Sequence, residues 1–119
     1  MDSKVASTYW NRIYIAGDYD KARDVCRQFC YKVGLCVNVT KHAYIYTGGE
    51  EDGVMVELIN YPRFPVDLDV DRNEIDEKGY HLGVMLKDQL CQDSFLIMTP
   101  LSTIWVTSRD EPVSSGDET

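Results

Sequence analysis

The sequence predicts a single domain of the α+β class. Short segments that alternate apolar and polar residues indicate several strands, and two longer segments repeat apolar residues at helical spacing. Glycine or proline separates most of these segments. With 119 residues, 44% of them hydrophobic, the chain is large enough to bury one core, so wholesale disorder is not expected.

The order of elements begins with a strand and a helix. Residues 11–16 alternate, with Ile13 and Ile15 on one side, and Asp18 is placed to cap the helix that follows. Gly34 stands where a left-handed residue ends a helix. The apolar stripe of this helix is formed by Ala22, Val25, Cys26, Phe29, Cys30 and Val33.

A hairpin is expected next. Residues 35–40 alternate as a strand, and residues 42–47 continue it after a bend. The turn is predicted over residues 48–53, because its three glycines permit positive φ and its acids favour water. Residues 54–61 return as the partner strand.

The last third of the chain predicts a second helix and a closing strand. Asp71 or Asn73 is placed to cap the helix, which ends near Gln92. Residues 95–99 form a strand, and residues 104–107 form either a last strand or its continuation. The apolar positions of the helix are Ile75, Gly79, Leu82, Leu86 and Leu90.

The resulting order, β-α-β-β-α-β, is that of a ferredoxin-like sandwich, an antiparallel sheet with two helices on one face. The other face of the sheet is then open. Residues 1–10 are expected to form a loose N-terminal leader, residues 11–109 the single α+β domain, and residues 110–119 a polar disordered tail.

The charge is unevenly distributed. The net charge is −8, with seven Lys and Arg against four Asp and Glu in residues 1–41, and five against sixteen in residues 42–119. Such an acidic chain is repelled by phosphate backbones, so nucleic acid is not the expected partner. No signal peptide or apolar run of about 20 residues is visible, and the cysteines suit a reducing compartment. Cytoplasm, with no membrane contact, is the expected location.

The sequence offers little catalytic or metal-binding chemistry. A calcium loop starting at Asp67 would need glycine and glutamate where Arg72 and Lys78 stand. The cysteine spacing matches no paired zinc motif, and neither His42 nor His81 is placed beside a thiol. We therefore expect no catalytic residues, no metal, no cofactor and no enzymatic activity.

The aromatic residues indicate a binding surface. If the apolar residues of the strands face the helices, Tyr14, Tyr44 and Tyr46 lie on the open face of the sheet. Such tyrosines can pair across strands, contact another protein or stack on bases, and the absence of basic neighbours disfavours stacking on bases. Arg63 and Phe64 in the segment YPRFP are candidate contact residues at the rim.

Several segments, in this order, resemble small uncharacterised proteins encoded by tailed bacteriophages. They are IYIAGDYDKA, C-x-x-F-C, GLCVNVT, YIYTGGEEDGV, LINYPRFP, LCQDSF and STIW, and the likeness covers roughly residues 11–108. None of these segments is a chemical signature. The resemblance implies a protein made in the cytoplasm of an infected bacterium.

The favoured hypothesis is a non-enzymatic accessory protein that binds a host or phage protein through the open sheet face. By analogy, it would inhibit host defence or modulate a host enzyme. A homodimer is compatible with the same surface.

Two alternatives remain open. The first is a nucleic-acid mimic, whose carboxylates imitate phosphates; they are Glu50, Glu51, Asp52, Asp67, Asp69 and Asp71. The second is a module or enzyme that binds a small ligand or nucleotide, with Arg12, Arg23 and Arg27 gripping phosphate.

Overall fold

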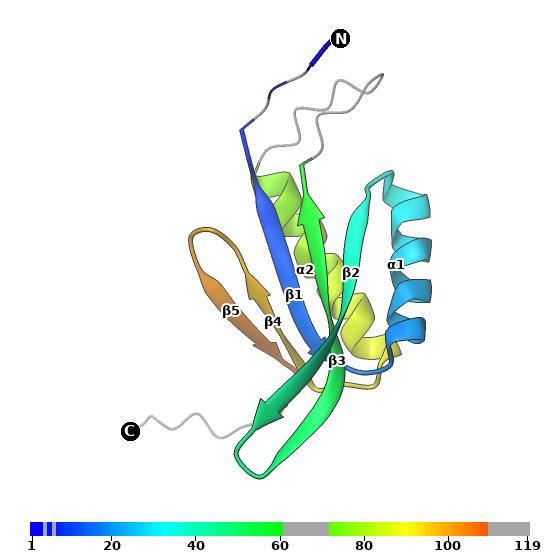
Figure 1. The fold of residues 1–119 in the computed structure, drawn as a ribbon, viewed down its shortest axis with the longest axis vertical. Helices are drawn as coiled ribbons and strands as arrows, with labels where there is room; N and C mark the ends of the chain where they lie inside the picture. The colour runs from blue at the N-terminus through cyan, green and yellow to red at the C-terminus, as the bar shows by residue number, and fades with distance from the viewer. Residues whose placement is uncertain (4, 6, 61–71, 110–119) are drawn as a thin grey trace.

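The computed structural model describes residues 1–60 and 72–109, except positions 4 and 6. Its sheet has the strand order β2-β3-β1-β4-β5, and every neighbouring pair is antiparallel (Figure 1). The elements are β1 (Trp10–Ala16), α1 (Tyr19–Val33), β2 (Val37–Tyr46), β3 (Gly49–Ile59), α2 (Arg72–Gln89), β4 (Ser94–Met98) and β5 (Thr103–Thr107). The predicted ferredoxin-like α+β fold is confirmed, with β5 as an additional edge strand.

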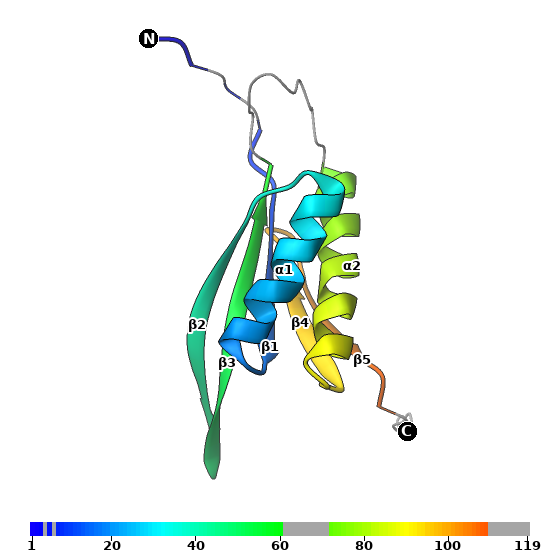
Figure 2. The same ribbon diagram turned by 90° about the vertical axis from the view of Figure 1, so that its right-hand side faces the viewer.

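The molecule has two layers. Both helices pack on the same face of the sheet, as Figure 2 shows, and the hydrophobic core lies between the helices and the sheet. Strand residues that alternate toward the helices are fully buried, as the period of two in a strand requires. The least exposed core residues include Ile13, Val54, Val56, Leu58, Leu82 and Leu86.

Helix α1 has the ends that its sequence predicts. The carboxylate of Asp18 accepts a hydrogen bond of 2.9 Å from the backbone N–H of Lys21, which satisfies an otherwise free donor of the first turn. At the other end Gly34 adopts φ 73°, and its N–H donates to the carbonyl of Cys30. These caps fix where the chain leaves β1 and where it enters β2.

Helix α2 approaches the sheet closely because two of its buried positions are glycines. A side chain at Gly79 would overlap the side chain of Asn11 in β1, and one at Gly83 would overlap the ring of Phe95 in β4. Asn73 lies within this helix and therefore is not its cap. The other candidate cap, Asp71, lies outside the described residues, as do Arg63 and Phe64.

The hairpin of β2 and β3 corrects one prediction. Gly49–Asp52, expected in the turn, are paired strand residues opposite Ala43–Tyr46. Composition misleads here because cross-strand pairing, rather than intrinsic preference, decides strand formation. Since β1 pairs with β3 only up to Gly53, these residues form a two-stranded arm that extends beyond the rest of the sheet (Figure 1).

The C-terminal end of the domain decides between the two predicted arrangements of residues 104–107, a separate last strand or a continuation of the strand before it. Residues 103–107 form a separate strand, β5, which reverses direction after Met98 and pairs with β4 alone. The intervening turn is closed by a 2.8 Å hydrogen bond from the N–H of Thr99 to the carbonyl of Ser102. Within the described part of the chain, neither helix has the length and apolar character needed to cross a bilayer.

Candidate ligand site on the open sheet face

The strand register creates an apolar row on the face of the sheet away from the helices. Tyr14 in β1 lies opposite Met55 in β3 and opposite Leu96 in β4. Leu96 in turn lies opposite Trp105 in β5. Because side chains at paired positions share a face, these four form a continuous row across neighbouring strands.

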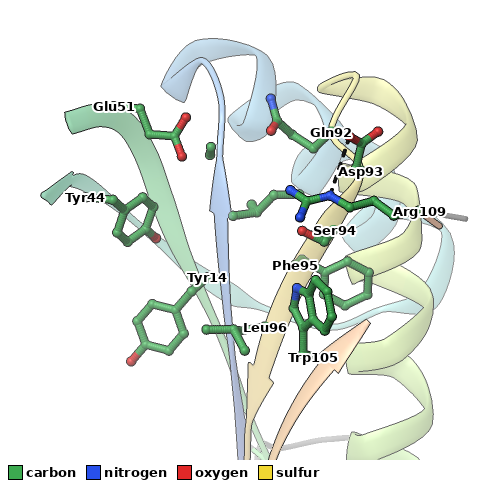
Figure 3. Close-up of a pocket in the computed structure, with 12 residues that line it drawn as sticks. Tyr14, Tyr44, Glu51, Gln92, Asp93, Ser94, Phe95, Leu96, Trp105 and Arg109 are labelled. Carbon is green, nitrogen blue, oxygen red and sulfur yellow. Dashed lines mark ion pairs between the residues drawn. The ribbon is translucent and has the colours of Figure 1, made fainter. Parts of the chain in front are cut away.

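A cavity of about 530 Å³ lies over part of this row, as Figure 3 shows. Its volume is within the range of roughly 300–1,000 Å³ found for small-molecule sites. Of the three tyrosines among the predicted binding residues, Tyr14 and Tyr44 line the cavity, whereas Tyr46 does not and is 55% exposed. The other lining residues are Ile15, Ala16, Glu51, Gln92, Asp93, Ser94, Phe95, Leu96, Trp105 and Arg109.

Tyr44 is held in place at the edge of this cavity. Its hydroxyl donates a hydrogen bond to the carbonyl of Val54, and its ring occupies the space left by the missing side chain of Gly53. Burial raises the pKa of Tyr44 to about 12, so the phenol stays protonated at neutral pH. The His42 ring lies 6.1 Å from that of Tyr14 and 5.8 Å from that of Tyr44, measured between centroids.

Polar groups lie on both sides of the cavity. Figure 3 shows Glu51 on the arm side and the pair Asp93 and Arg109 on the other side of the cavity. The Nε atom of Arg109 is 3.7 Å from the carboxylate of Asp93, and its guanidinium lies 5.9 Å from the Trp105 ring centroid. The cavity therefore offers aromatic faces together with the Glu51 carboxylate and the Asp93–Arg109 pair at its rim, a combination suited to a ligand with a flat ring and charged groups.

The three arginines expected to grip phosphate are not brought together. Arg12 lies on the open face, where its Nε donates to Glu57 at 2.8 Å and its guanidinium covers the Trp10 ring at 4.2 Å. Arg23 and Arg27 line a different cavity, of about 290 Å³, beside α1 and β2. That separation excludes one phosphate site made by all three.

The Arg12–Glu57 pair is a structural contact of the sheet. Asn38 also donates to the Glu57 carboxylate, at 3.2 Å. The Arg12 hydrogen bond holds the pKa of Glu57 below its usual value, and the same bond raises the pKa of Arg12. Both groups therefore remain charged and paired across β1 and β3.

No cysteine among the described residues lines the cavity. Burial raises the pKa of Cys26 to about 12, and burial also raises the pKa of Cys30, so neither is activated as a nucleophile. Cys36 and Cys91 are exposed. Over the described ranges, no group of three or more His, Cys, Asp or Glu side chains is arranged to hold a metal ion.

Sequence reasoning missed the contribution of the C-terminal part of the domain. Trp105 alternates with Ile104 and Val106 in a predicted strand, a signal that could have placed it on the open face. No pattern in the sequence indicates that Asp93 and Arg109 belong to the site. Asp93 follows α2 and Arg109 follows β5, each in an irregular segment.

Comparison with known structures finds the same fold in two phage proteins. The structure matches a phage SAM lyase in its apo state with a TM-score of 0.70 and 14% sequence identity, covering 92% of this chain and 97% of that one. A phage SAM lyase in complex with S-methyl-5′-thioadenosine matches with a TM-score of 0.63 and 15% identity, covering 93% and 98%. No family model and no curated protein sequence matches. At these identities the likeness establishes the shared fold.

These matches correct the predicted function. The fold extends over nearly the whole length of two structures named as enzymes, which contradicts both the non-enzymatic protein binder and the expected lack of activity. The alternative of a module that binds a small ligand agrees better with the matches and with the cavity. The phage source of both structures agrees with the resemblance to small phage proteins.

Proposed function

We propose that this protein is an enzyme that binds S-adenosylmethionine, or a closely related sulfonium nucleoside, in the cavity on the open sheet face. The observation that carries the proposal is the cavity itself, in which Tyr14, Tyr44 and Trp105 stand near Glu51 and Asp93. The fold shared with phage SAM lyases supports the same assignment.

The chemistry of such a ligand suits these side chains. A purine stacks on aromatic rings, and a sulfonium is attracted to their π-faces as other organic cations are. Carboxylates accept hydrogen bonds from ribose hydroxyls and attract a positive charge. The net charge of −8 also favours a cationic substrate over an anionic one.

The proposed reaction is cleavage of a carbon–sulfur bond. S-adenosylmethionine and S-methyl-5′-thioadenosine differ by the aminobutyrate chain on sulfur, so conversion of one into the other breaks that bond and leaves its electron pair on sulfur. The chain departs in one of two ways: it loses the proton β to sulfur to a carboxylate of the cavity and forms an alkene, or its own carboxylate captures its terminal carbon and forms a lactone.

The residues of the cavity would act mainly by binding and positioning. A site that holds the nucleoside against Trp105 and the tyrosines, away from bulk water, favours loss of the sulfonium charge. Tyr44, with its pKa of about 12, serves as a neutral wall of the site rather than as a base.

The test is direct incubation of the purified protein with S-adenosylmethionine, followed by mass spectrometry. We expect S-methyl-5′-thioadenosine to accumulate. The identity of the second product, formed from the aminobutyrate chain, shows whether that chain leaves as the lactone or as the alkene. Binding is measured separately by thermal unfolding, because a ligand at 100 times its Kd adds about 2.7 kcal/mol to the stability of the folded state. The proposal is contradicted if no S-methyl-5′-thioadenosine forms and if neither nucleoside stabilises the protein.

A further inference from the structure

A second cavity adjoins the candidate site. Its volume is about 490 Å³, and it lies around the junction of β1 and α1, next to the arm of β2 and β3. Three residues line both cavities: Ala16, Glu51 and Gln92. The two hollows therefore border each other at these three residues.

The two cavities differ in chemistry. The first has the aromatic walls formed by Tyr14, Tyr44 and Trp105. The second contains charged groups of both signs, with the acids Asp18, Asp20, Glu51 and Asp52 and the base Lys41. Aromatic walls favour the nucleoside, whereas mixed charges favour a zwitterion.

Lys41 is the basic side chain among the described residues that line the second cavity. Its Nζ atom lies 5.5 Å from the centroid of the Tyr19 ring, and it makes no ion pair with any described residue. The carboxylate of Asp18 is engaged at the cap of α1, whereas no hydrogen bond or ion pair of the Asp52 side chain occurs among the described residues. A cation and an acid are thus available in one cavity.

We propose that the second cavity binds the amino-acid end of the substrate, with Lys41 contacting its carboxylate and Asp52 its ammonium group, while the nucleoside occupies the first cavity. This inference rests on the proposed function. It makes Lys41 and Asp52 specificity-determining residues, which distinguish a nucleoside that carries an amino-acid chain from one that lacks it.

The experiment compares two stable ligands by calorimetry. S-adenosylhomocysteine carries the amino-acid chain, and S-methyl-5′-thioadenosine does not. Lys41→Met and Asp52→Asn are each expected to weaken binding of S-adenosylhomocysteine by about tenfold, because a hydrogen bond to a charged group is lost. Binding of S-methyl-5′-thioadenosine should not change. Lys21→Met is the matched control, since Lys21 is an exposed lysine of α1 that lines neither cavity.

The outcomes separate this inference from the proposed function. If the parent protein binds both ligands and the two variants leave their affinity ratio unchanged, the amino-acid subsite is wrong and the nucleoside site stands. The same holds if the parent binds only S-methyl-5′-thioadenosine. If the parent binds neither nucleoside, the proposed function fails and the subsite fails with it. Thermal unfolding of each variant shows whether a lost affinity reflects a lost fold.

Discussion

The ring of Tyr44 occupies the space that a side chain at Gly53 would need. A Cβ atom at Gly53 would overlap this ring and lie 2.6 Å from the carbonyl oxygen of Ile15. The hydroxyl of Tyr44 reaches past this point to the carbonyl of Val54. The missing side chain in β3 thus fixes the position of an aromatic wall of the cavity.

Replacing Gly53 with alanine should therefore disturb both the fold and the site. We expect Gly53→Ala to lower the free energy of unfolding by about 1–3 kcal/mol, the usual cost of overpacking, and to weaken nucleoside binding. Chemical denaturation and calorimetry measure the two effects. Gly49→Ala is the control in the same strand, because its Cβ would meet only the exposed ring of Tyr46. Equal stability of the two variants would show that the Tyr44 ring is not fixed in this way.

Trp105 should contribute to nucleoside affinity although it is 48% exposed. Stacking of a base on an aromatic ring contributes roughly 1–3 kcal/mol, so Trp105→Ala should weaken binding of S-methyl-5′-thioadenosine about tenfold. Tyr31→Ala is the matched control, since Tyr31 is 91% exposed on α1, on the other face of the sheet. If both variants bind as the parent does, the base does not stack on Trp105.

The Arg12–Glu57 pair predicts a dependence of stability on pH. The pKa of Glu57 is lowered in the folded state by the hydrogen bond from Arg12, and the Glu57 side chain is only 16% exposed. Its contribution is therefore present above the unfolded pKa of about 4.3 and is lost as pH falls through the lower folded pKa. Glu57→Gln should reduce the unfolding free energy at pH 7, and its difference from the parent should shrink toward pH 3.

A series of denaturation curves between pH 3 and pH 7 measures this difference. Arg12 is 38% exposed, so added salt should weaken the effect in part. A difference between parent and Glu57→Gln that stays constant over this range would contradict the assignment of the lowered pKa to Glu57.

The contact between Gly79 and Asn11 should couple α2 to β1. A methyl group at Gly79 would overlap the Asn11 amide oxygen, which is buried and has no hydrogen-bond partner among the described residues. The amide nitrogen of Asn11 donates to Asp76 at 2.7 Å and to the carbonyl of Trp10 at 2.9 Å. We expect Gly79→Ala to destabilise the protein by about 1–3 kcal/mol.

A double-mutant cycle tests this contact. In the background of Asn11→Ala the added methyl group gains space, so the double variant should be more stable than the sum of the single effects predicts. Strict additivity of the two unfolding free energies would indicate that the helix shifts away from the strand and that the two positions are not in contact.

Periodicity and capping residues predicted most of the fold. The stripe of α1, its cap at Asp18 and its end at Gly34 depend on local chemistry, which a single sequence displays. Residues 49–52 were misplaced because their glycine and acidic side chains favour a turn, while pairing with β2 holds them in a strand. Local preference and tertiary pairing disagree there, and pairing prevails.

The candidate site was only partly predictable. Alternation placed Tyr14 and Tyr44 on the open face. The cavity also needs Gln92, Asp93 and Arg109, which come from two irregular segments far from these tyrosines in the sequence. Nothing in the spacing of those residues shows that they meet. The absence of a recognised catalytic motif also led to the wrong expectation of no activity, because a site that acts mainly by binding and positioning requires no such motif.

Strand β5 makes the cavity dependent on the sheet's outermost hydrogen bonds. It pairs with β4 alone, so its amides can exchange with solvent through local opening that leaves the helices and the other strands intact. A ligand resting on Trp105 would bind only the closed form and would slow that exchange in proportion to its occupancy. Slow hydrogen exchange along the β5 edge and saturation of the cavity by a ligand would then be two measures of the same equilibrium.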